Sequence, residues 1–119
     1  LLTSVGVNVN TRSQSRGAPL HVVSTVSFAK RTDLFEMVDL LLANGAKIDL
    51  QDHNGDTPLL RSVHTGNDCL SAYLVKKGAD PFIVDRMGFN SFTKSSMLCQ
   101  PKVFLALKTF GPPISDDLL

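Results

Sequence analysis

Apolar residues recur at helical spacing in several short stretches of the chain, separated by turn-forming residues. Leu70, Tyr73 and Leu74 stand at i, i+3 and i+4, which predicts a short amphipathic helix. Residues 57–66 predict another short helix just before it, because that stretch opens with a capping Thr followed by Pro and closes on Gly. Residues 52–55, Asp-His-Asn-Gly, have the composition of a tight turn. The pattern therefore predicts a unit made of a turn, two short helices and a loop.

The same unit recurs along the chain. The pair Gly45-Ala46 recurs as Gly78-Ala79, and the turn that begins at Asp52 recurs at the same separation. The separation between Pro19-Leu20 and its next match is longer by six positions, which indicates an insertion near positions 25–32. Agreement of several markers on one period is typical of repeat proteins, whose short helices bury their apolar faces by stacking on neighbouring units.

These residues resemble the ankyrin-repeat family. One copy has Thr57-Pro58-Leu59, followed at the family's spacing by Gly66 and by Gly78-Ala79-Asp80, and an earlier copy has Ala18-Pro19-Leu20-His21. The resemblance implies an all-α solenoid of stacked helix–turn–helix units with β-turn fingers. Both copies depart from the family pattern, since Ala18 stands where a capping Thr is usual and Leu60 where His is usual. Each is therefore expected to be slightly less stable than an idealised repeat.

The predicted repeat domain covers residues 1–111 and contains three recognisable repeats and a partial one. In order, it comprises a partial repeat (1–10), a repeat with the insertion (11–51), a middle repeat (52–84) and a degenerate capping repeat (85–111), followed by a C-terminal tail (112–119). Because the chain opens inside a repeat and without Met, we expect more of the protein upstream. The insertion is expected to lengthen the first helix of its repeat, the connection to the second helix, or both. Caps usually have a polar outer face, for which the candidates are Thr93, Lys94, Ser95 and Ser96.

Composition supports a packed domain and narrows the classes of partner. Hydrophobic residues make up 43% of the chain and charged residues 19%, which is enough apolar material for a core. Leu41 and Leu74, which the repeat period makes equivalent, are expected to share a core position. Twelve Lys and Arg against eleven Asp and Glu leave a net charge of +1, which argues against direct binding of nucleic acid or of an anionic membrane. With two Cys, no visible signal peptide and no apolar run for membrane insertion, an intracellular location, cytoplasmic or nuclear, is favoured.

The sequence contains no motif for catalysis, cofactor binding or metal binding. It lacks phosphate-binding glycine loops, the Gly-x-Ser-x-Gly nucleophile motif and His-Glu-x-x-His, so we predict neither an enzyme active site nor a cofactor. His53 and His64 can be imagined as a metal pair, but a turn-tip His and a helix-surface His are favoured because their spacing is loose. Cys69 and Cys99 are expected to be buried or half-buried small apolar residues rather than catalytic thiols.

The partner-binding surface that the resemblance implies lies on the turn tips and on the concave face of the first helix of each repeat. A row of side chains on a stiff scaffold loses little conformational entropy on binding. The predicted partner-binding residues are Gln51, His53, Asn54, Asp56, His64, Thr65, Arg86, Met87 and Phe89, with Lys94 and Met97 on the same surface. Gln14, Arg16 and Ala18 are their counterparts in the repeat with the insertion.

Two features of this surface leave alternatives open. Met87 and Phe89 flank a turn glycine beside Arg86, a combination typical of binding hot spots, but the C-terminal tail or an adjoining domain is an alternative cover for both. Phe28, among basic residues of the insertion, belongs either to a protruding contact loop or a small basic patch, or to a helix extension with Phe28 tucked down and the charges solvated.

The sequence thus predicts a non-catalytic protein–protein interaction module for a protein or peptide partner. The alternative is a regulatory or substrate-recruiting ankyrin segment of a larger enzyme, such as a ubiquitin ligase or a trafficking regulator. A third hypothesis, a role in a transcription complex, predicts a steeply salt-dependent affinity for DNA and is disfavoured by the balanced charge.

Overall fold

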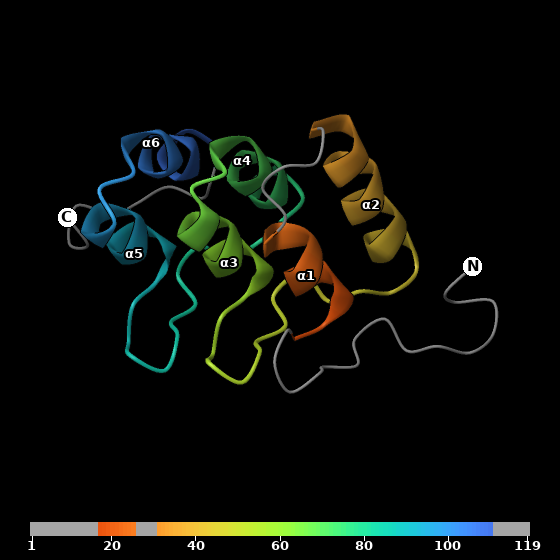
Figure 1. Cartoon of the computed structure of the whole chain (residues 1–119), viewed down its shortest axis with the longest axis horizontal. Coiled ribbons are helices and arrows are strands. Elements are labelled where there is room, and N and C mark those ends of the chain that lie inside the picture. Colours follow the sequence, from red (N-terminus) through yellow and green to blue (C-terminus); the bar gives the residue numbers. More distant parts are fainter. Residues whose placement is uncertain (1–16, 26–30, 111–119) are drawn as a thin grey trace.

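Six helices form three consecutive pairs in the computed structural model, which describes residues 17–25 and 31–110. The helices are α1 (Pro19–Thr25), α2 (Arg31–Ala43), α3 (Pro58–Thr65), α4 (Asp68–Lys76), α5 (Ser91–Met97) and α6 (Pro101–Phe110). The pairs stand side by side, with α1, α3 and α5 in an inner layer and α2, α4 and α6 in an outer layer (Figure 1). No β-strand occurs in the described residues, and the predicted all-α solenoid is confirmed.

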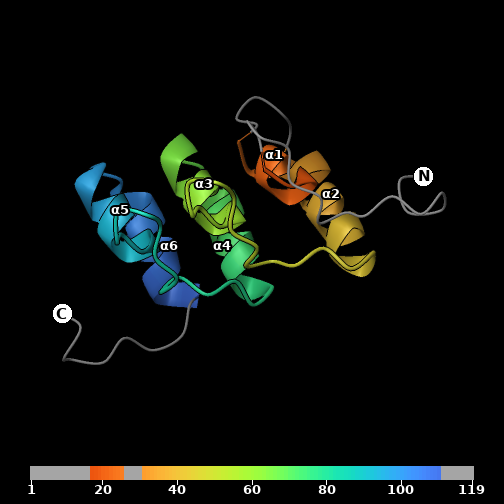
Figure 2. The same ribbon diagram turned by 90° about the horizontal axis from the view of Figure 1, so that it is seen from below.

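The three pairs are stacked along one axis, as the view from below shows (Figure 2). We call α1–α2, α3–α4 and α5–α6 the first, middle and last repeats. Long loops precede α3 and α5 and project from the inner layer (Figure 1); we call them finger 52–57 and finger 85–90. The predicted partial repeat and C-terminal tail lie outside the described residues, as do Gln14, Arg16 and Phe28.

Helices α3, α4 and α5 begin at capping residues that the sequence provides, and α3 ends at a glycine. The side chain of Thr57 accepts a hydrogen bond from the Leu60 backbone N–H at 3.2 Å and so caps α3. Gly66 ends that helix with φ 71°, the left-handed conformation that glycine adopts without strain. Asn67 and Asn90 cap α4 and α5 through their side-chain oxygens. These caps satisfy helix-end groups that lack partners within the helix.

The first repeat differs from the middle one in the length of its second helix. α1 has seven residues against eight in α3, whereas α2 has 13 residues against nine in α4. α2 begins at Arg31, inside the stretch assigned to the insertion, so a longer second helix accompanies the insertion, which the sequence analysis did not predict. The predicted lengthening of the first helix or of its connection concerns residues 26–30, which lie outside the described residues.

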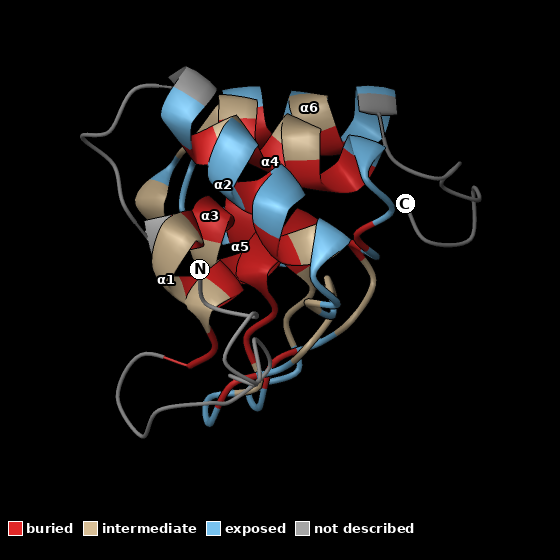
Figure 3. Cartoon of the chain, turned by 90° about the vertical axis from the view of Figure 1, so that its right-hand side faces the viewer, coloured by how far each residue is buried: buried red, intermediate tan, exposed pale blue. Residues whose placement is uncertain are grey.

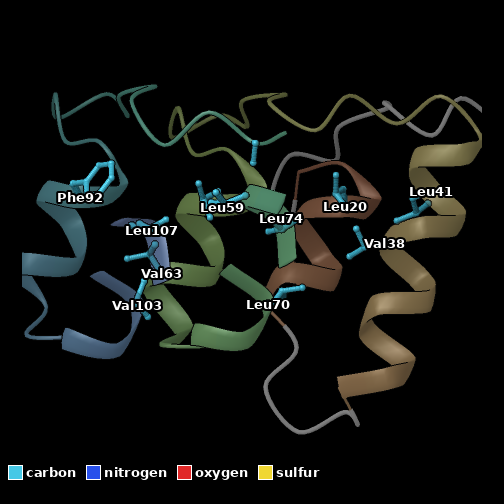
Figure 4. Packing of buried hydrophobic residues seen from close by; sticks show 12 residues of the cluster. Leu20, Val38, Leu41, Leu59, Val63, Leu70, Leu74, Phe92, Val103 and Leu107 are labelled. Atoms are coloured by element: carbon cyan, nitrogen blue, oxygen red, sulfur yellow. The ribbon is translucent and has the colours of Figure 1, made fainter. Parts of the chain in front are cut away.

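The hydrophobic core lies between the two layers (Figure 4). Leu41, Leu74 and Leu107, which follow one another at the repeat period, are at most 2% exposed. Leu41 and Leu74 thus share a buried position as expected, and the last repeat continues the series. Buried residues gather between the layers, whereas exposed residues lie on the outward side of α2 and along the fingers (Figure 3).

An aromatic contact joins the outer helices of the first and middle repeats. Phe35 in α2 stacks on Tyr73 in α4, with ring centroids 4.1 Å apart. The Tyr73 hydroxyl donates to Asp39 at 2.6 Å, and Lys77 Nζ lies 3.3 Å from the same carboxylate. Exposed ion pairs stabilise little on their own, so the stacked rings are the main element of this contact.

Candidate partner-binding surface

The two described fingers are built on the same turn. In finger 52–57 the Asp52 carboxylate accepts hydrogen bonds from the backbone N–H groups two and four residues later, both at 2.9 Å. In finger 85–90 the Asp85 carboxylate accepts the equivalent bonds at 2.9 and 3.0 Å. An aspartate that satisfies the N–H groups of its own turn holds the backbone in one conformation.

Each finger aspartate also binds a cation from the following helix. Arg61 Nε lies 2.9 Å from the Asp52 carboxylate, and Lys94 Nζ lies 3.2 Å from that of Asp85. The two pairs have the same spacing and occupy equivalent positions of successive repeats. Lys94 is buried, with Nζ 5.0 Å from the centroid of the Phe89 ring. The expectation that Lys94 is exposed, on the partner-binding surface or on the outer face of a cap, is therefore wrong.

The finger aspartates remain ionised because of these contacts. Burial alone raises the pKa of Asp52, but hydrogen bonds from the Asp56 backbone N–H and from Arg61 outweigh burial and hold that pKa below its usual value. Burial alone also raises the pKa of Asp85. The hydrogen bonds from its own turn and from Lys94 outweigh that effect and hold the pKa of Asp85 below its usual value. Both fingers therefore keep a buried negative charge that is neutralised locally.

Asp56 lies beneath the surface rather than on it. It is 6% exposed, and its carboxylate lies 3.8 Å from Arg61 Nε and 3.8 Å from His64 Nε2. Burial, with the negative charge of Asp52 nearby, raises the pKa of Asp56. The expected exposed position of Asp56 is therefore wrong, because its side chain packs inside the base of the finger.

Hydrogen bonds tie the two fingers to each other. The Arg86 backbone N–H donates to the Asn54 carbonyl at 3.1 Å, and the Gln51 side-chain amide donates to the Val84 carbonyl at 2.9 Å. A Cβ on Gly55 would lie 2.8 Å from the Arg86 backbone nitrogen, so glycine permits this close approach. The spacing between the fingers is thus fixed by the chain itself.

Most of the other predicted partner-binding residues are exposed. The exposed ones are Gln51, His53, Asn54, His64, Arg86 and Met87. Thr65 and Phe89 are half-buried, and the Thr65 hydroxyl donates to the Ser62 carbonyl at 3.0 Å. Met87 is 76% exposed, so no described residue covers it, while Lys94 covers part of Phe89. A role of Met87 as a partner anchor remains a prediction.

Comparison with known proteins agrees with this architecture. Residues 20–109 match ankyrin repeats in three copies. The chain belongs to the ankyrin-repeat family. It is 29% identical over 90 residues to an ankyrin repeat protein of Acanthamoeba polyphaga mimivirus, a match that covers 76% of this chain and 55% of the viral protein.

Two further relatives are much longer proteins. The chain is 37% identical over 54 residues to the ADP-ribosylation factor GTPase-activating protein AGD2 of Arabidopsis thaliana, covering 45% of this chain and 7% of that protein. It is 35% identical over 65 residues to the ankyrin repeat and KH domain-containing protein mask-1 of Caenorhabditis elegans, covering 54% of this chain and 2% of that protein. The chain therefore spans about half of the viral relative and a small part of the other two.

The middle and last ankyrin repeats carry opposite chemistry on their inner surface. Four polar surface residues of the middle repeat are each replaced by an apolar residue at the equivalent position of the last: Gln51, Asn54, His64 and Thr65 become Val84, Met87, Met97 and Leu98. Beneath this surface, the buried Asp56 is replaced by the half-buried Phe89. Four of these apolar residues are well exposed, namely Val84 (47%), Met87 (76%), Met97 (54%) and Leu98 (41%). The two finger tips keep a nitrogen-bearing side chain, His53 in one and Arg86 in the other.

His21 links the first repeat to finger 52–57, a role that the sequence analysis missed. Its side chain is fully buried, Nδ1 accepts from the Ala18 backbone N–H at 3.1 Å, and Nε2 donates to the Asp56 carbonyl at 2.7 Å. Burial lowers the pKa of His21, which favours the neutral ring that these two bonds require. The family motif identified His21 in the sequence, but no sequence pattern predicted that its partner is the backbone carbonyl of Asp56 in the next finger.

The outward side of the last repeat differs from the expected polar cap. Thr93 and Ser96 are exposed, but Ser95 is buried, so the expectation is wrong in part. An open groove of about 790 Å³ lies between α5 and α6, and its lining includes Phe104 and Leu105. Leu105 is 62% exposed. This side of the repeat is therefore more apolar than the sequence suggested.

The two cysteines differ in their exposure to solvent. Cys69 is half-buried, but Cys99 is exposed, contrary to its expected packed position. Cys99 has φ 54° and occupies the position that Gly66 has in the middle repeat.

In the described part of the chain, no three His, Cys, Asp or Glu residues are grouped to hold a metal ion. None of the helices described is long and apolar enough to cross a membrane.

Proposed function

We propose that this ankyrin-repeat segment is a non-catalytic module that binds a protein or peptide partner through its finger tips and the inner face of α3 and α5. The observation that carries the proposal is the rigidity of the fingers. Each is held by an aspartate that binds its own turn and a cation of the next helix, and the two are joined by hydrogen bonds.

The backbone of such fingers is held in one conformation before a partner arrives. The exposed tips carry His53, Asn54, Arg86 and Met87, which offer hydrogen bonds, positive charge and apolar area. Because little backbone freedom is lost on binding, a larger part of the contact energy remains as affinity. Ankyrin repeats in general are protein-interaction modules, which supports this proposal.

Site-specific photo-crosslinking tests the proposal. Benzoylphenylalanine is placed at position 53 or 87 on the fingers, or at position 36 on the exposed side of α2 as a matched control. In extract of the source organism, the finger positions are expected to crosslink a partner that an excess of the unlabelled chain displaces. Crosslinks only at position 36, or none that the chain displaces, would contradict the proposal.

A second candidate is an ankyrin segment that recruits a substrate or regulates a larger enzyme, such as a ubiquitin ligase or a trafficking regulator. The match to a GTPase-activating protein, in which the matched region is 7% of the whole, favours keeping this candidate. The two candidates differ in what surrounds the segment. An enzymatic domain in the full-length protein, whose activity towards the crosslinked partner falls when finger residues are changed, would favour the second.

A further inference from the structure

The inner surface exposes one guanidinium, that of Arg86, together with apolar and neutral polar groups, and keeps its carboxylates buried. Asp52, Asp56 and Asp85 are 6%, 6% and 7% exposed, and they face Arg61, Lys94 or backbone N–H groups. The exposed ionisable side chains on the two fingers and on α3 are His53, Arg86 and His64.

Exposed carboxylates of the described residues lie elsewhere. Asp33, Glu36 and Asp39 are on α2, and Asp80 is in the loop that follows α4. The sequence ahead of α2 adds none to the inner surface, because residues 1–32 contain no Asp or Glu. Exposed lysines also lie on the outer helices, as Lys76 on α4 and Lys102 and Lys108 on α6 do. The inner surface therefore differs from the outer helices in lacking exposed carboxylates, so that the charge of Arg86 has no exposed acidic neighbour on the fingers or on α3.

Apolar area is concentrated on the last repeat of the same surface. Val84 and Met87 are exposed on and beside finger 85–90, and Met97 and Leu98 are exposed at the end of α5. The middle repeat has Gln51, Asn54, His64 and Thr65 at the equivalent positions. Exposed apolar residues gathered on one face are typical of interaction sites, and Met and Arg are both enriched in such sites.

Resting on the function proposed above, we infer that the partner is a peptide segment that combines carboxylate side chains with aliphatic or aromatic ones. Its carboxylates lie against Arg86 and His53 at the finger tips, where no exposed carboxylate of the fingers competes. Its apolar residues lie on the last repeat, against Met87 and Val84. A segment rich in Lys or Arg is excluded by repulsion from Arg86 and by the absence of an exposed acidic partner on the described part of this surface.

Selection of displayed peptides tests the inference without knowledge of the natural partner. Short linear peptides from a random phage library are selected on the whole chain, residues 1–119, and dissociation constants of synthetic peptides are then measured by fluorescence anisotropy. We expect enrichment of Asp and Glu together with Leu, Ile, Met or aromatic residues. Arg86→Glu is expected to weaken binding by about tenfold or more.

Charge exchange separates contact with Arg86 from an effect on folding. Peptides whose acidic residues are changed to Lys are expected to bind Arg86→Glu better than the unchanged chain. Met87→Asn is expected to weaken the original peptides several-fold, whereas Met37→Asn, on an exposed Met of α2, leaves them unchanged.

The outcomes distinguish this inference from the function on which it rests. Basic peptides that depend on Met87 would overturn the partner chemistry and leave a binding surface on the fingers. Failure to enrich any peptide, or enrichment of peptides indifferent to Arg86→Glu and Met87→Asn, would overturn the inference. If position 53 or 87 of the same chain nevertheless crosslinks a partner, the proposed protein-binding function holds although the inferred chemistry of the partner is wrong.

Discussion

The middle and last repeats share one internal framework and differ on the surface that it supports. Both fingers close on an aspartate, and both aspartates bind a cation nine residues later, as Asp52 does with Arg61 and Asp85 with Lys94. At four inner-surface positions, however, the middle repeat is polar and the last is apolar. The residues that hold the finger and those that face outward have therefore diverged independently.

The two repeats also differ in what surrounds them. α4 packs against α2 on one side and α6 on the other, whereas the last repeat has a neighbour on one side only among the described residues. Gly55 is approached by the backbone of the next finger, while a Cβ on Gly88 would meet no atom within 4 Å. Equivalent substitutions in the two repeats should thus have unequal effects.

Core truncation gives the largest expected effect. Leu74→Ala and Leu107→Ala remove equivalent, fully buried side chains. Each is expected to lower the free energy of unfolding by about 2–5 kcal/mol, with Leu74 at the upper end because its helix is packed on both sides. Urea unfolding followed by circular dichroism measures both. Equal losses would remove the distinction between the repeats, and losses near zero at both would mean that the repeat register is wrong.

Removal of the two cations that bind the finger aspartates tests the shared framework. Arg61→Met leaves two buried carboxylates without their cation and is expected to cost about 3 kcal/mol. Lys94→Met leaves only Asp85 and is expected to cost less, about 1–2 kcal/mol, because Met keeps the packing of the Lys stem. Thermal and urea unfolding report both values. A larger loss for Lys94→Met would show that Asp56 does not depend on Arg61.

The turn glycines separate conformational strain from close approach. Gly88→Ala places a Cβ at φ 87° in open space and is expected to cost about 1–2 kcal/mol. Gly55→Ala adds a contact of 2.8 Å with the Arg86 backbone and is expected to cost more, and to weaken the bond between the fingers. Amide hydrogen exchange at Arg86 measures the second effect. Unchanged exchange in Gly55→Ala would contradict the tie between the fingers.

The link from the first repeat to the middle one should depend on pH. Because the folded state lowers the pKa of His21 from its ordinary value of 6.5, the stability that neutral His21 provides is complete above pH 6.5 and is lost as pH falls towards the folded-state pKa. His21→Leu introduces the residue found at the equivalent position of the middle repeat, Leu60. We expect a lower melting temperature at neutral pH and a smaller loss on acidification from pH 7.5 to 5.

The control for this pH dependence is Met37→Ala, an exposed site on α2 that does not titrate and should leave the change in melting temperature with pH as it is. Asp56, whose pKa is raised, acts in the opposite direction: its contribution is complete below its ordinary pKa of 3.8 and is lost as pH rises through the raised value. If the melting temperature of His21→Leu still falls on acidification as steeply as that of the unchanged chain, groups other than His21 cause the pH dependence.

The smallest expected effect concerns the exposed difference between the repeats. Met87→Asn gives finger 85–90 the residue of the middle finger position, Asn54, and should change the free energy of unfolding by less than about 0.5 kcal/mol. Thermal unfolding provides the measurement. A fall of several degrees would mean that parts of the chain outside the described residues pack on Met87, the alternative to a partner anchor.

The helices and turns of the repeats could be located from the sequence because the same marker residues recur in successive repeats. Two turn aspartates and two glycine stops at one period, with two prolines separated by six positions more, defined the helices and the common position of Leu41 and Leu74. It misplaced Asp56, Lys94 and Ser95, since polar residues near a turn were assigned to the surface by type. The Asp52–Arg61 and Asp85–Lys94 spacing was present in the sequence and would have indicated that both cations turn inward.

Other features depend on contacts that no local pattern encodes. The bond from His21 to the Asp56 carbonyl joins two different repeats, and α2 begins earlier than the position equivalent to the start of α4. The polar-to-apolar change between repeats was visible in the sequence, but its meaning depends on exposure. Phe89 and Met87 are two residues apart in the chain, yet one is half-buried against Lys94 and the other is open.

The stacked pair of Phe35 and Tyr73 gives the protein a built-in optical probe. Tyr73 is the single tyrosine of a chain that has no tryptophan. Its ring lies across the junction of the first and middle repeats, and its hydroxyl is bound to Asp39. Ultraviolet-excited emission of the unlabelled protein therefore originates largely at one junction, and it registers when these two repeats separate, independently of the helical content.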